Sequence, residues 1–158
     1  MSDFVMMTDS CCDLSAELAA ELELEVLPLR LELEGRSYRN LLDGGEIGFQ
    51  EFYSKVRSGA MPVTSAVNVG EFDAAMRPIL EAGKDILCLC FSSALSTTYQ
   101  SAVIAGRELE EAFPERKVRV VDSLCASMGQ GLLVWLCAQE KKKGKTLEEV
   151  LDFAEGAK

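Results

Sequence analysis

Residues 86–98 have the sequence ILCLCFSSALSTT, an unbroken apolar run followed by a loop rich in serine and threonine. An apolar run without polar alternation is typical of a strand that is buried on both faces, as in the interior of a parallel sheet. Apolar residues recur at helical spacing after the loop, and Pro114 ends that pattern. The segment therefore predicts a strand, a loop and a helix in that order, which is the repeating unit of an α/β fold.

The same order of elements recurs on either side of this segment. Residues 4–7 and 118–121 are short apolar runs that end in polar residues, and each precedes a segment with helical periodicity. We therefore expect an α/β domain with a mainly parallel sheet flanked by helices. The predicted helices cover residues 14–22, capped by Asp13 or Ser15, and residues 46–57, 72–82, 99–113, 127–143 and 146–157.

A different pattern interrupts this alternation between residues 24 and 65. Leucines alternate with charged residues near its start, so residues 24–33 are predicted to form one strand with a buried face and a wet face. Gly35 and Arg36 then turn the chain, and residues 37–39 form the second strand of a hairpin. Residues 61–65 are expected to form an extended loop, because Pro62 disfavours a helical conformation of the residue before it.

Composition and charge exclude several classes of partner. The chain has 158 residues, of which 26 are acidic and 16 basic, and its formal net charge is −10. This charge repels nucleic acid and anionic lipid surfaces. No basic leader with an apolar segment is visible, and runs such as residues 86–91 are too short to span a bilayer. We expect a cytoplasmic protein with no membrane span and no nucleic-acid partner.

Histidine is absent, and the six cysteines form no CxxC pair. The lack of histidine removes Ser-His-Asp and Cys-His catalysis from within the chain, together with most zinc sites. Cys88 and Cys90 alternate with Leu89 in the apolar run, so we interpret them as buried thiols in a reducing compartment. We expect no metal, no cofactor and no catalytic residue.

Polar residues gather at the carboxyl ends of the predicted strands, which is where ligands bind in open α/β sheets. Hydroxyl groups supply neutral hydrogen bonds, and the first turn of a helix supplies backbone amides at a partly positive end. Together these groups suit a carboxylate or a phosphate that is held without covalent chemistry. The candidate ligand-binding residues are Thr64, Ser65, Ser96 and Ser93, with Asp9, Ser10, Asp122 and Ser123 as supporting polar residues at the strand ends.

Two other interpretations remain open on the residues alone. Asp9 and Ser10 would be the reacting groups of a phosphotransferase, although the chain has no Gly-Lys-Ser/Thr phosphate loop. Alternatively, the hydroxyl groups only cap helices, and the domain is an interaction module with no ligand. Gly129 and Gly131 are too sparse for a dinucleotide-binding loop and are expected to permit close packing.

Four stretches of the sequence resemble the DegV family of bacterial lipid-binding proteins. They are Thr8–Ser10 with Asp13–Leu14, Pro62–Ser65 with Gly70–Phe72, Ser92–Ala102, and Asp122–Gly131. The turn at Gly35 with Tyr38 and Arg39 also fits the family's hairpin. The stretches follow the family's order over nearly the whole chain, so the resemblance is more specific than any single motif.

This resemblance implies a carrier that is not an enzyme. In such a carrier a long-chain fatty acid lies between two domains, and its carboxylate is held by Thr64, with Ser65, and by Ser96, with Ser93 as the less favoured serine. The carrier presents the acid to a separate fatty-acid kinase, which forms the acyl phosphate. Residues 1–158 resemble the amino-terminal domain, and the carboxy-terminal domain that covers the lipid is absent from them. An uncovered apolar face would then allow a homodimer.

Overall fold

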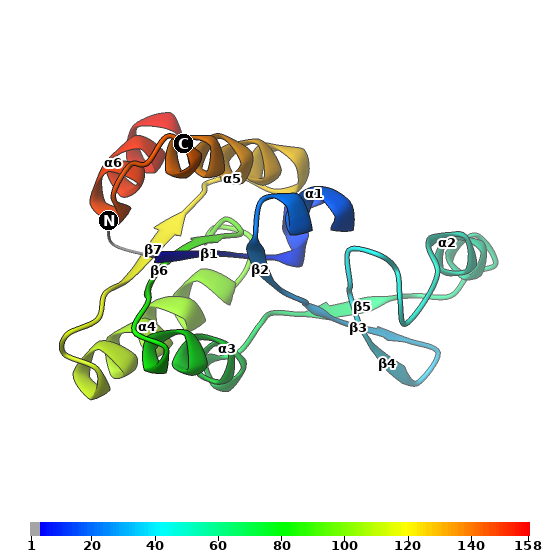
Figure 1. The fold of residues 1–158 in the computed structure, drawn as a ribbon. Helices are drawn as coiled ribbons and strands as arrows, with labels where there is room; N and C mark the ends of the chain where they lie inside the picture. Colours follow the sequence, from blue (N-terminus) through cyan, green and yellow to red (C-terminus); the bar gives the residue numbers. More distant parts are fainter. Residues whose placement is uncertain (1–3) are drawn as a thin grey trace.

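The computed structural model describes residues 4–158, which form two β-sheets and the helices that cover them (Figure 1). The strands are β1 (Phe4–Asp9), β2 (Leu24–Leu27), β3 (Arg30–Leu33), β4 (Arg36–Arg39), β5 (Val63–Ser65), β6 (Asp85–Cys90) and β7 (Val118–Asp122). The helices are α1 (Ala16–Glu21), α2 (Phe49–Arg57), α3 (Val69–Glu81), α4 (Thr98–Ala112), α5 (Ser127–Lys142) and α6 (Leu147–Ala157), and a short 3-10 helix, η1 (Ser10–Cys12), follows β1.

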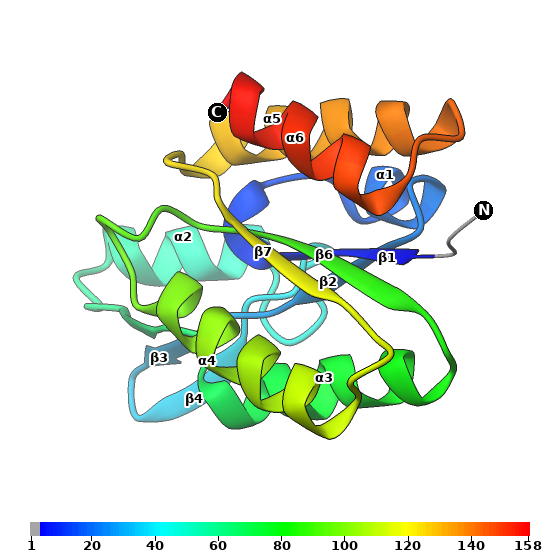
Figure 2. The same cartoon turned by 90° about the vertical axis from the view of Figure 1, so that its left-hand side faces the viewer.

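The main sheet contains four strands in the order β2-β1-β6-β7, and all neighbouring strands are parallel. Helices α5 and α6 lie over one face, and α3 and α4 lie over the other, as the views in Figure 1 and Figure 2 show. The predicted α/β architecture with a mainly parallel sheet flanked by helices is confirmed. Because the strands are parallel, the chain leaves β1, β6 and β7 at the same edge of the sheet.

Strand β6 is buried on both faces. Leu87 and Leu89 belong to the core that contains residues of α5 and α6, whereas Ile86, Cys88 and Cys90 belong to the core that contains residues of α3 and α4. This double burial is the physical reason for the unbroken apolar sequence of the strand. The expected burial of both thiols is confirmed, and their sulfur atoms lie 3.5 Å apart.

The prediction of one strand over residues 24–33 is wrong, because the chain changes sheets at Pro28. Strand β2 ends before it in the main sheet, and β3 begins after it in a second, antiparallel sheet with the order β4-β3-β5. Pro28 has no N–H group for a ladder, and the N–H of Leu29 donates to Ser10 Oγ (3.0 Å) instead. The predicted hairpin is present as β3 and β4. Residues 63–65, expected as part of a loop, form β5 because they pair with the other edge of β3.

Helix α2 covers one face of this small sheet, where Leu31, Leu33, Tyr38 and Ile47 form a third core. The helix begins at Phe49 rather than at residue 46, because the segment before it is held by other contacts. The Glu46 carboxylate accepts hydrogen bonds from the backbone N–H and the guanidinium of Arg39 on β4. Within residues 4–158, no helix has both the length and the apolar character needed to cross a membrane.

Candidate functional site

Asp9 ends β1 and joins three separate parts of the chain. Its Oδ2 accepts a hydrogen bond from the Phe91 N–H (2.7 Å), and its Oδ1 accepts one from the Cys11 N–H (3.0 Å). Nε2 of Gln130 on α5 donates to Asp9 Oδ1 (3.2 Å) and to Thr8 Oγ1 (3.0 Å). Asp9 is 1% exposed, and burial raises its pKa above 3.8 although these hydrogen bonds favour the charged form. The carboxylate therefore fixes the edge of the sheet and has no access to a reactant.

Ser10 is equally enclosed, at 2% exposure. Its Oγ accepts hydrogen bonds from the Leu29 N–H (3.0 Å) and from Asn40 Nδ2 (3.2 Å). These contacts tie the end of β1 to the point where the chain crosses into the small sheet. A phosphotransferase needs a nucleophile that can reach its donor, so this geometry argues against Asp9 and Ser10 as reacting groups.

Asp122 and Ser123, at the end of β7, shape the neighbouring loops. Oδ1 of Asp122 accepts hydrogen bonds from the N–H groups of Ser93 and Leu124, both at 3.1 Å. Burial opposes the charged form of Asp122, but hydrogen bonds from Ser93 and Leu124 outweigh it, so its pKa is lowered. Ser123 is fully buried, and its Oγ lies 3.2 Å from both the backbone N and the backbone O of Cys125. Both residues thus support the loop that follows β6.

Ser93 and Ser96 lie in that loop, and both are half-buried. Ser96 Oγ accepts a hydrogen bond from the Thr98 N–H (3.2 Å) and lies 2.9 Å from Thr98 Oγ1. It therefore stabilises the start of α4, which begins at Thr98, at the end of the predicted loop. The loop itself is braced by Ser92, whose N–H donates to the Cys125 carbonyl (3.0 Å). Serine hydroxyls and the first amides of a helix are thus placed at one edge of the sheet.

An apolar pocket of about 390 Å³ lies between the small sheet, α2 and the segment after β1. The small sheet contributes Leu31 and Thr64, α2 contributes Phe49, Phe52 and Tyr53, and the ends of β1 and β6 contribute Cys11 and Phe91. Of the predicted ligand-binding residues, Thr64 lines this pocket, whereas Ser65, Ser93 and Ser96 are not among its lining residues. Phe91 connects the pocket to the serine loop, because Ser92 and Ser93 follow it directly.

The pairing of β5 with β3 separates the two hydroxyls of the Thr64-Ser65 pair. Thr64 lies opposite Leu31, and Ser65 lies opposite Arg30. Residues directly opposite each other project to the same face of a sheet, and neighbouring residues project to opposite faces. The Thr64 side chain therefore shares the face that α2 covers, while the Ser65 side chain projects from the other face.

The sequence did not predict every residue after β1 that lines the pocket, and Cys11 is an example. Cys11 faces the pocket, and burial, followed by the nearby carboxylates Asp9 and Asp13, raises its pKa to about 12. Its thiol is therefore protonated at neutral pH and acts as a small apolar wall group. The apolar spacing of the α2 aromatics was visible in the sequence, but the pocket that they cover was not. Among the described residues, no group of three or more acidic or cysteine side chains is arranged to hold a metal ion.

The sequence also matches a family model over nearly its entire length. Residues 3–158 match the model described as "Uncharacterised protein, DegV family". The chain belongs to the DegV family. A DegV domain-containing protein of Clostridium perfringens is 41% identical over 155 residues, which are 98% of this chain and 53% of that protein. A DegV domain-containing protein of Streptococcus pyogenes is 36% identical over 152 residues, which are 96% of this chain and 53% of that protein. The chain thus spans about half the length of these DegV relatives.

Solved structures of fatty-acid-binding proteins, one of them a DegV protein, have the same fold as this chain. The fatty-acid-binding DegV protein of Thermus thermophilus has a TM-score of 0.85 and 36% identity, covering 98% of this chain and 53% of that one. A stearic-acid-binding protein of Eubacterium ventriosum has a TM-score of 0.86 and 26% identity, covering 96% and 52%. A Thermotoga maritima protein with a fatty acid binding function has a TM-score of 0.83 and 29% identity, covering 99% and 55%.

Proposed function

We propose that this DegV domain binds a long-chain fatty acid and does not transform it. The observation that carries the proposal is the position of Thr64, which lines an apolar pocket beside the serine loop and shares a face of the small sheet with Leu31. In this arrangement Thr64 holds the carboxylate together with Ser96, and Ser93 is the next candidate. Ser65 is the least favoured of the four predicted residues, because its side chain projects from the opposite face of β5.

The chemistry of the pocket fits a fatty acid. Neutral hydroxyls and helix amides stabilise a carboxylate without a buried counter-charge. The walls formed by Leu29, Leu31 and the α2 aromatics remove the acyl chain from water, and each buried methylene contributes about 0.8 kcal/mol. The supporting groups, Asp9, Ser10, Asp122 and Ser123, hold the loops that carry the hydroxyls. Holding the carboxylate and burying the acyl chain require no cofactor, and neither makes the domain an enzyme.

The relatives are about twice as long as this chain, and we propose that the remaining part of a full-length DegV protein covers the lipid. Large apolar side chains are exposed near the edge of the sheet where β6 and β7 end, including Leu95 (67%), Leu124 (60%) and Met128 (62%). Exposed apolar patches of this kind mark interaction surfaces. In the absence of a covering domain, the same surface would support a homodimer, which sedimentation at increasing protein concentration would detect.

The place of the carrier in a reaction sequence is also a proposal. A bound acid that is presented with its carboxylate at the sheet edge suits a separate fatty-acid kinase that forms the acyl phosphate. We place this exchange in the cytoplasm, where the six free thiols stay reduced. Incubation of loaded protein with a fatty-acid kinase and ATP, followed by detection of acyl phosphate with and without the carrier, tests this role.

The first test of the function is identification of the bound molecule. The protein is purified without detergent, and the molecules that copurify with it are identified by mass spectrometry. We expect a fatty acid at one equivalent in the wild type and its loss in the double variant T64A/S96A. A wild type that yields no lipid and is not stabilised by added fatty acid would favour an interaction module without a ligand. Turnover of a phosphoryl donor by the protein alone would favour the phosphotransferase.

A further inference from the structure

Ser96 and Thr98 form a pair of hydrogen-bonded hydroxyls at the start of α4. Ser96 Oγ lies 2.9 Å from Thr98 Oγ1, and it accepts a hydrogen bond from the Thr98 N–H (3.2 Å). The two residues differ in burial, because Thr98 is 0% exposed whereas Ser96 is half-buried. One hydroxyl of the pair is therefore sealed inside the fold, and the other remains open to solvent.

The burial of Thr98 decides which of the two hydroxyls donates. Among residues 4–158, Ser96 Oγ is the only hydrogen-bond partner of the Thr98 hydroxyl. If Ser96 donated its proton to Thr98, the proton of the buried Thr98 hydroxyl would have no acceptor. A buried donor without an acceptor is costly and is rare in folded proteins. The hydrogen-bond network therefore assigns the Thr98 hydroxyl as the donor and Ser96 Oγ as the acceptor.

This assignment makes the Ser96 hydroxyl a donor only. A hydroxyl oxygen has two lone pairs and carries one proton. The N–H and the hydroxyl of Thr98 occupy both lone pairs of Ser96 Oγ, and no group in the part of the chain that the structure describes accepts the Ser96 proton. Because hydrogen bonds in a chain polarise one another, the bond from Thr98 also strengthens Ser96 as a donor. Ser96 thus offers one proton to a ligand and has no lone pair left to accept one.

Ser93, in the same loop, does not have this property. Its N–H donates to Asp122 Oδ1 (3.1 Å), and its side chain hydrogen-bonds to the same carboxylate. Because a carboxylate only accepts hydrogen bonds, the proton of the Ser93 hydroxyl is directed at Asp122. The Ser93 hydroxyl therefore holds the loop, whereas the Ser96 hydroxyl is available to a ligand.

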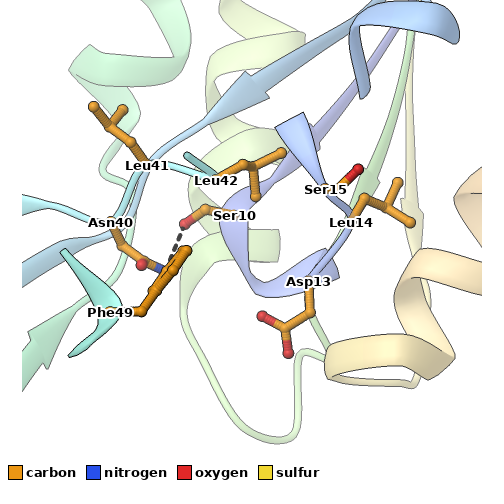
Figure 3. A pocket seen from close by; sticks show the side chains of 8 residues that line it. All are labelled: Ser10, Asp13, Leu14, Ser15, Asn40, Leu41, Leu42 and Phe49. Carbon is orange, nitrogen blue, oxygen red and sulfur yellow. Dashed lines mark hydrogen bonds between the residues drawn. The ribbon is translucent and has the colours of Figure 1, made fainter. Parts of the chain in front are cut away.

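Ser10 is another hydroxyl that accepts two hydrogen bonds, but it lies elsewhere. The Leu29 N–H (3.0 Å) and Asn40 Nδ2 (3.2 Å) both donate to Ser10 Oγ. Figure 3 shows the Asn40 side chain beside Ser10, with this hydrogen bond dashed, in a separate pocket of about 280 Å³ between the segments that follow β1 and β4. Ser10 is 2% exposed, and the serine loop does not line this pocket. Ser10 therefore does not compete with Ser96 for a ligand at the start of α4.

We propose that Thr98 is a positioning residue that makes Ser96 a donor-only contact, and that this contact selects a carboxylate head group over an amide of the same shape. The inference rests on the proposed function, because it places the carboxylate of the ligand at Ser96 and Thr64. A carboxylate oxygen accepts the Ser96 proton, whereas the NH₂ group of a primary amide meets a hydroxyl that has no free lone pair. Thr98 thus sets the specificity of the site without contact with the ligand.

The test compares the affinities of hexadecanoic acid and hexadecanamide, measured by displacement of a fluorescent fatty acid. Wild-type protein should bind the acid about tenfold more tightly, because hydrogen bonds to charged groups are stronger than neutral ones. Thr98→Val keeps the buried shape and removes the hydroxyl, so Ser96 can then accept an amide N–H. The affinity ratio of acid to amide should fall about fivefold, which is the contribution of one neutral hydrogen bond. Thr98→Ser keeps the hydroxyl and should retain the wild-type ratio.

Thr97→Val is the matched control, since Thr97 is exposed and its side chain makes no cap for α4. It should leave the ratio unchanged. Ser96→Ala tests whether Thr98 acts through Ser96. If it does, addition of Thr98→Val to Ser96→Ala should not change the ratio further.

Three outcomes overturn the inference and leave the proposed function intact. They are equal weakening of both ligands in Thr98→Val, a further fall of the ratio when Thr98→Val is added to Ser96→Ala, and a wild type that binds the amide as tightly as the acid. A ratio that Thr98→Val does not change overturns the inference as well. If the wild type binds neither ligand and does not bind the fluorescent fatty acid, the proposed function itself fails.

Discussion

Thr64 lies directly opposite Leu31 in the pairing of β5 with β3. A hydroxyl and a buried leucine therefore share one face of the small sheet, beneath helix α2. This juxtaposition places Thr64 on the wall of an apolar pocket, and the proposed fatty-acid site rests on it. Ser65, the next residue, lies opposite Arg30 and shares the other face.

Replacement of Thr64 by valine should weaken fatty-acid binding. Valine keeps the branched shape but removes the hydroxyl, and a hydrogen bond to a charged group contributes about 1.5–3 kcal/mol. The dissociation constant of hexadecanoic acid should therefore rise by about tenfold or more. Titration calorimetry on the wild type and the variant measures this change.

The matched control is Ser65→Ala, which removes the neighbouring hydroxyl from the opposite face of the strand. It should change the dissociation constant much less than Thr64→Val does. An equal rise of the dissociation constant in the two variants would mean that the face of β5 does not decide which hydroxyl contacts the carboxylate.

Cys11 offers a readout of pocket occupancy. Its pKa of about 12 leaves almost no thiolate at pH 8, so alkylation by iodoacetamide should be slow. Saturation with fatty acid should slow it further, because Cys11 lines the pocket. Peptide mass spectrometry after timed alkylation measures both effects.

Cys125 serves as the internal reference for this experiment, since it is partly exposed in the loop after β7 and does not line the acyl pocket. Its alkylation rate should not depend on the lipid. If the lipid protects both cysteines equally, the protection reflects a general tightening of the fold rather than occupancy of the pocket.

Asp9 should make a pH-dependent contribution to stability. Burial raises its pKa in the folded protein above 3.8, so the folded state binds this proton more tightly than the unfolded state does. Its contribution to the free energy of unfolding is fully present below the unfolded pKa and is lost as pH rises through the folded pKa. Asp9→Asn removes this titration.

Urea unfolding of both proteins at several pH values between 4 and 7 isolates the effect, because other carboxylates titrate in both. The wild type minus Asp9→Asn difference should be largest at the acid end and should decline to a plateau. A difference that does not change with pH would show that Asp9 does not titrate in this range.

The parallel sheet could be predicted from sequence because its strands are buried on both faces. The apolar run around Cys88 predicts a central strand on its own, because this pattern depends on no distant residue. Pro28 is also plain in the sequence, but the change of sheet at this residue is not. The alternation of leucines with charged residues continues on both sides of Pro28, and only the pairing partners of β2 and β3 show that they belong to two sheets. The short β5 has too few residues for a pattern, and it is a strand only because β3 offers an edge.

The site could be predicted in part for the same reason. Polar strand ends were visible, and so was their gathering at one edge of a parallel sheet. The sequence did not show which of these polar side chains are buried and hold the structure and which remain accessible, because that depends on hydrogen-bond partners far away in the sequence. Phe91 and Gln130 bond Asp9 from 82 and 121 positions away. The resemblance to DegV proteins supplied Thr64, whose position on the pocket wall depends on the register of β5.

Replacement of Gly131 by alanine should destabilise the protein and distort the pocket wall. A Cβ atom at this position of α5 would lie 2.4 Å from the Cys12 carbonyl oxygen and 3.0 Å from a side-chain carbon of Leu14. The backbone of Cys12 cannot retreat freely, because the neighbouring Cys11 N–H is held by Asp9. Overpacking of this kind costs about 1–3 kcal/mol, which urea unfolding measures.

Gly156→Ala is the control, since a Cβ atom there meets nothing within 4 Å, and alanine in a helix is more favourable than glycine by about 0.5–1 kcal/mol. Since η1 also positions Cys11 and Asp13, Gly131→Ala should in addition weaken fatty-acid binding, whereas Gly156→Ala should not. Wild-type stability in Gly131→Ala would mean that α5 does not pack against η1 as closely as described.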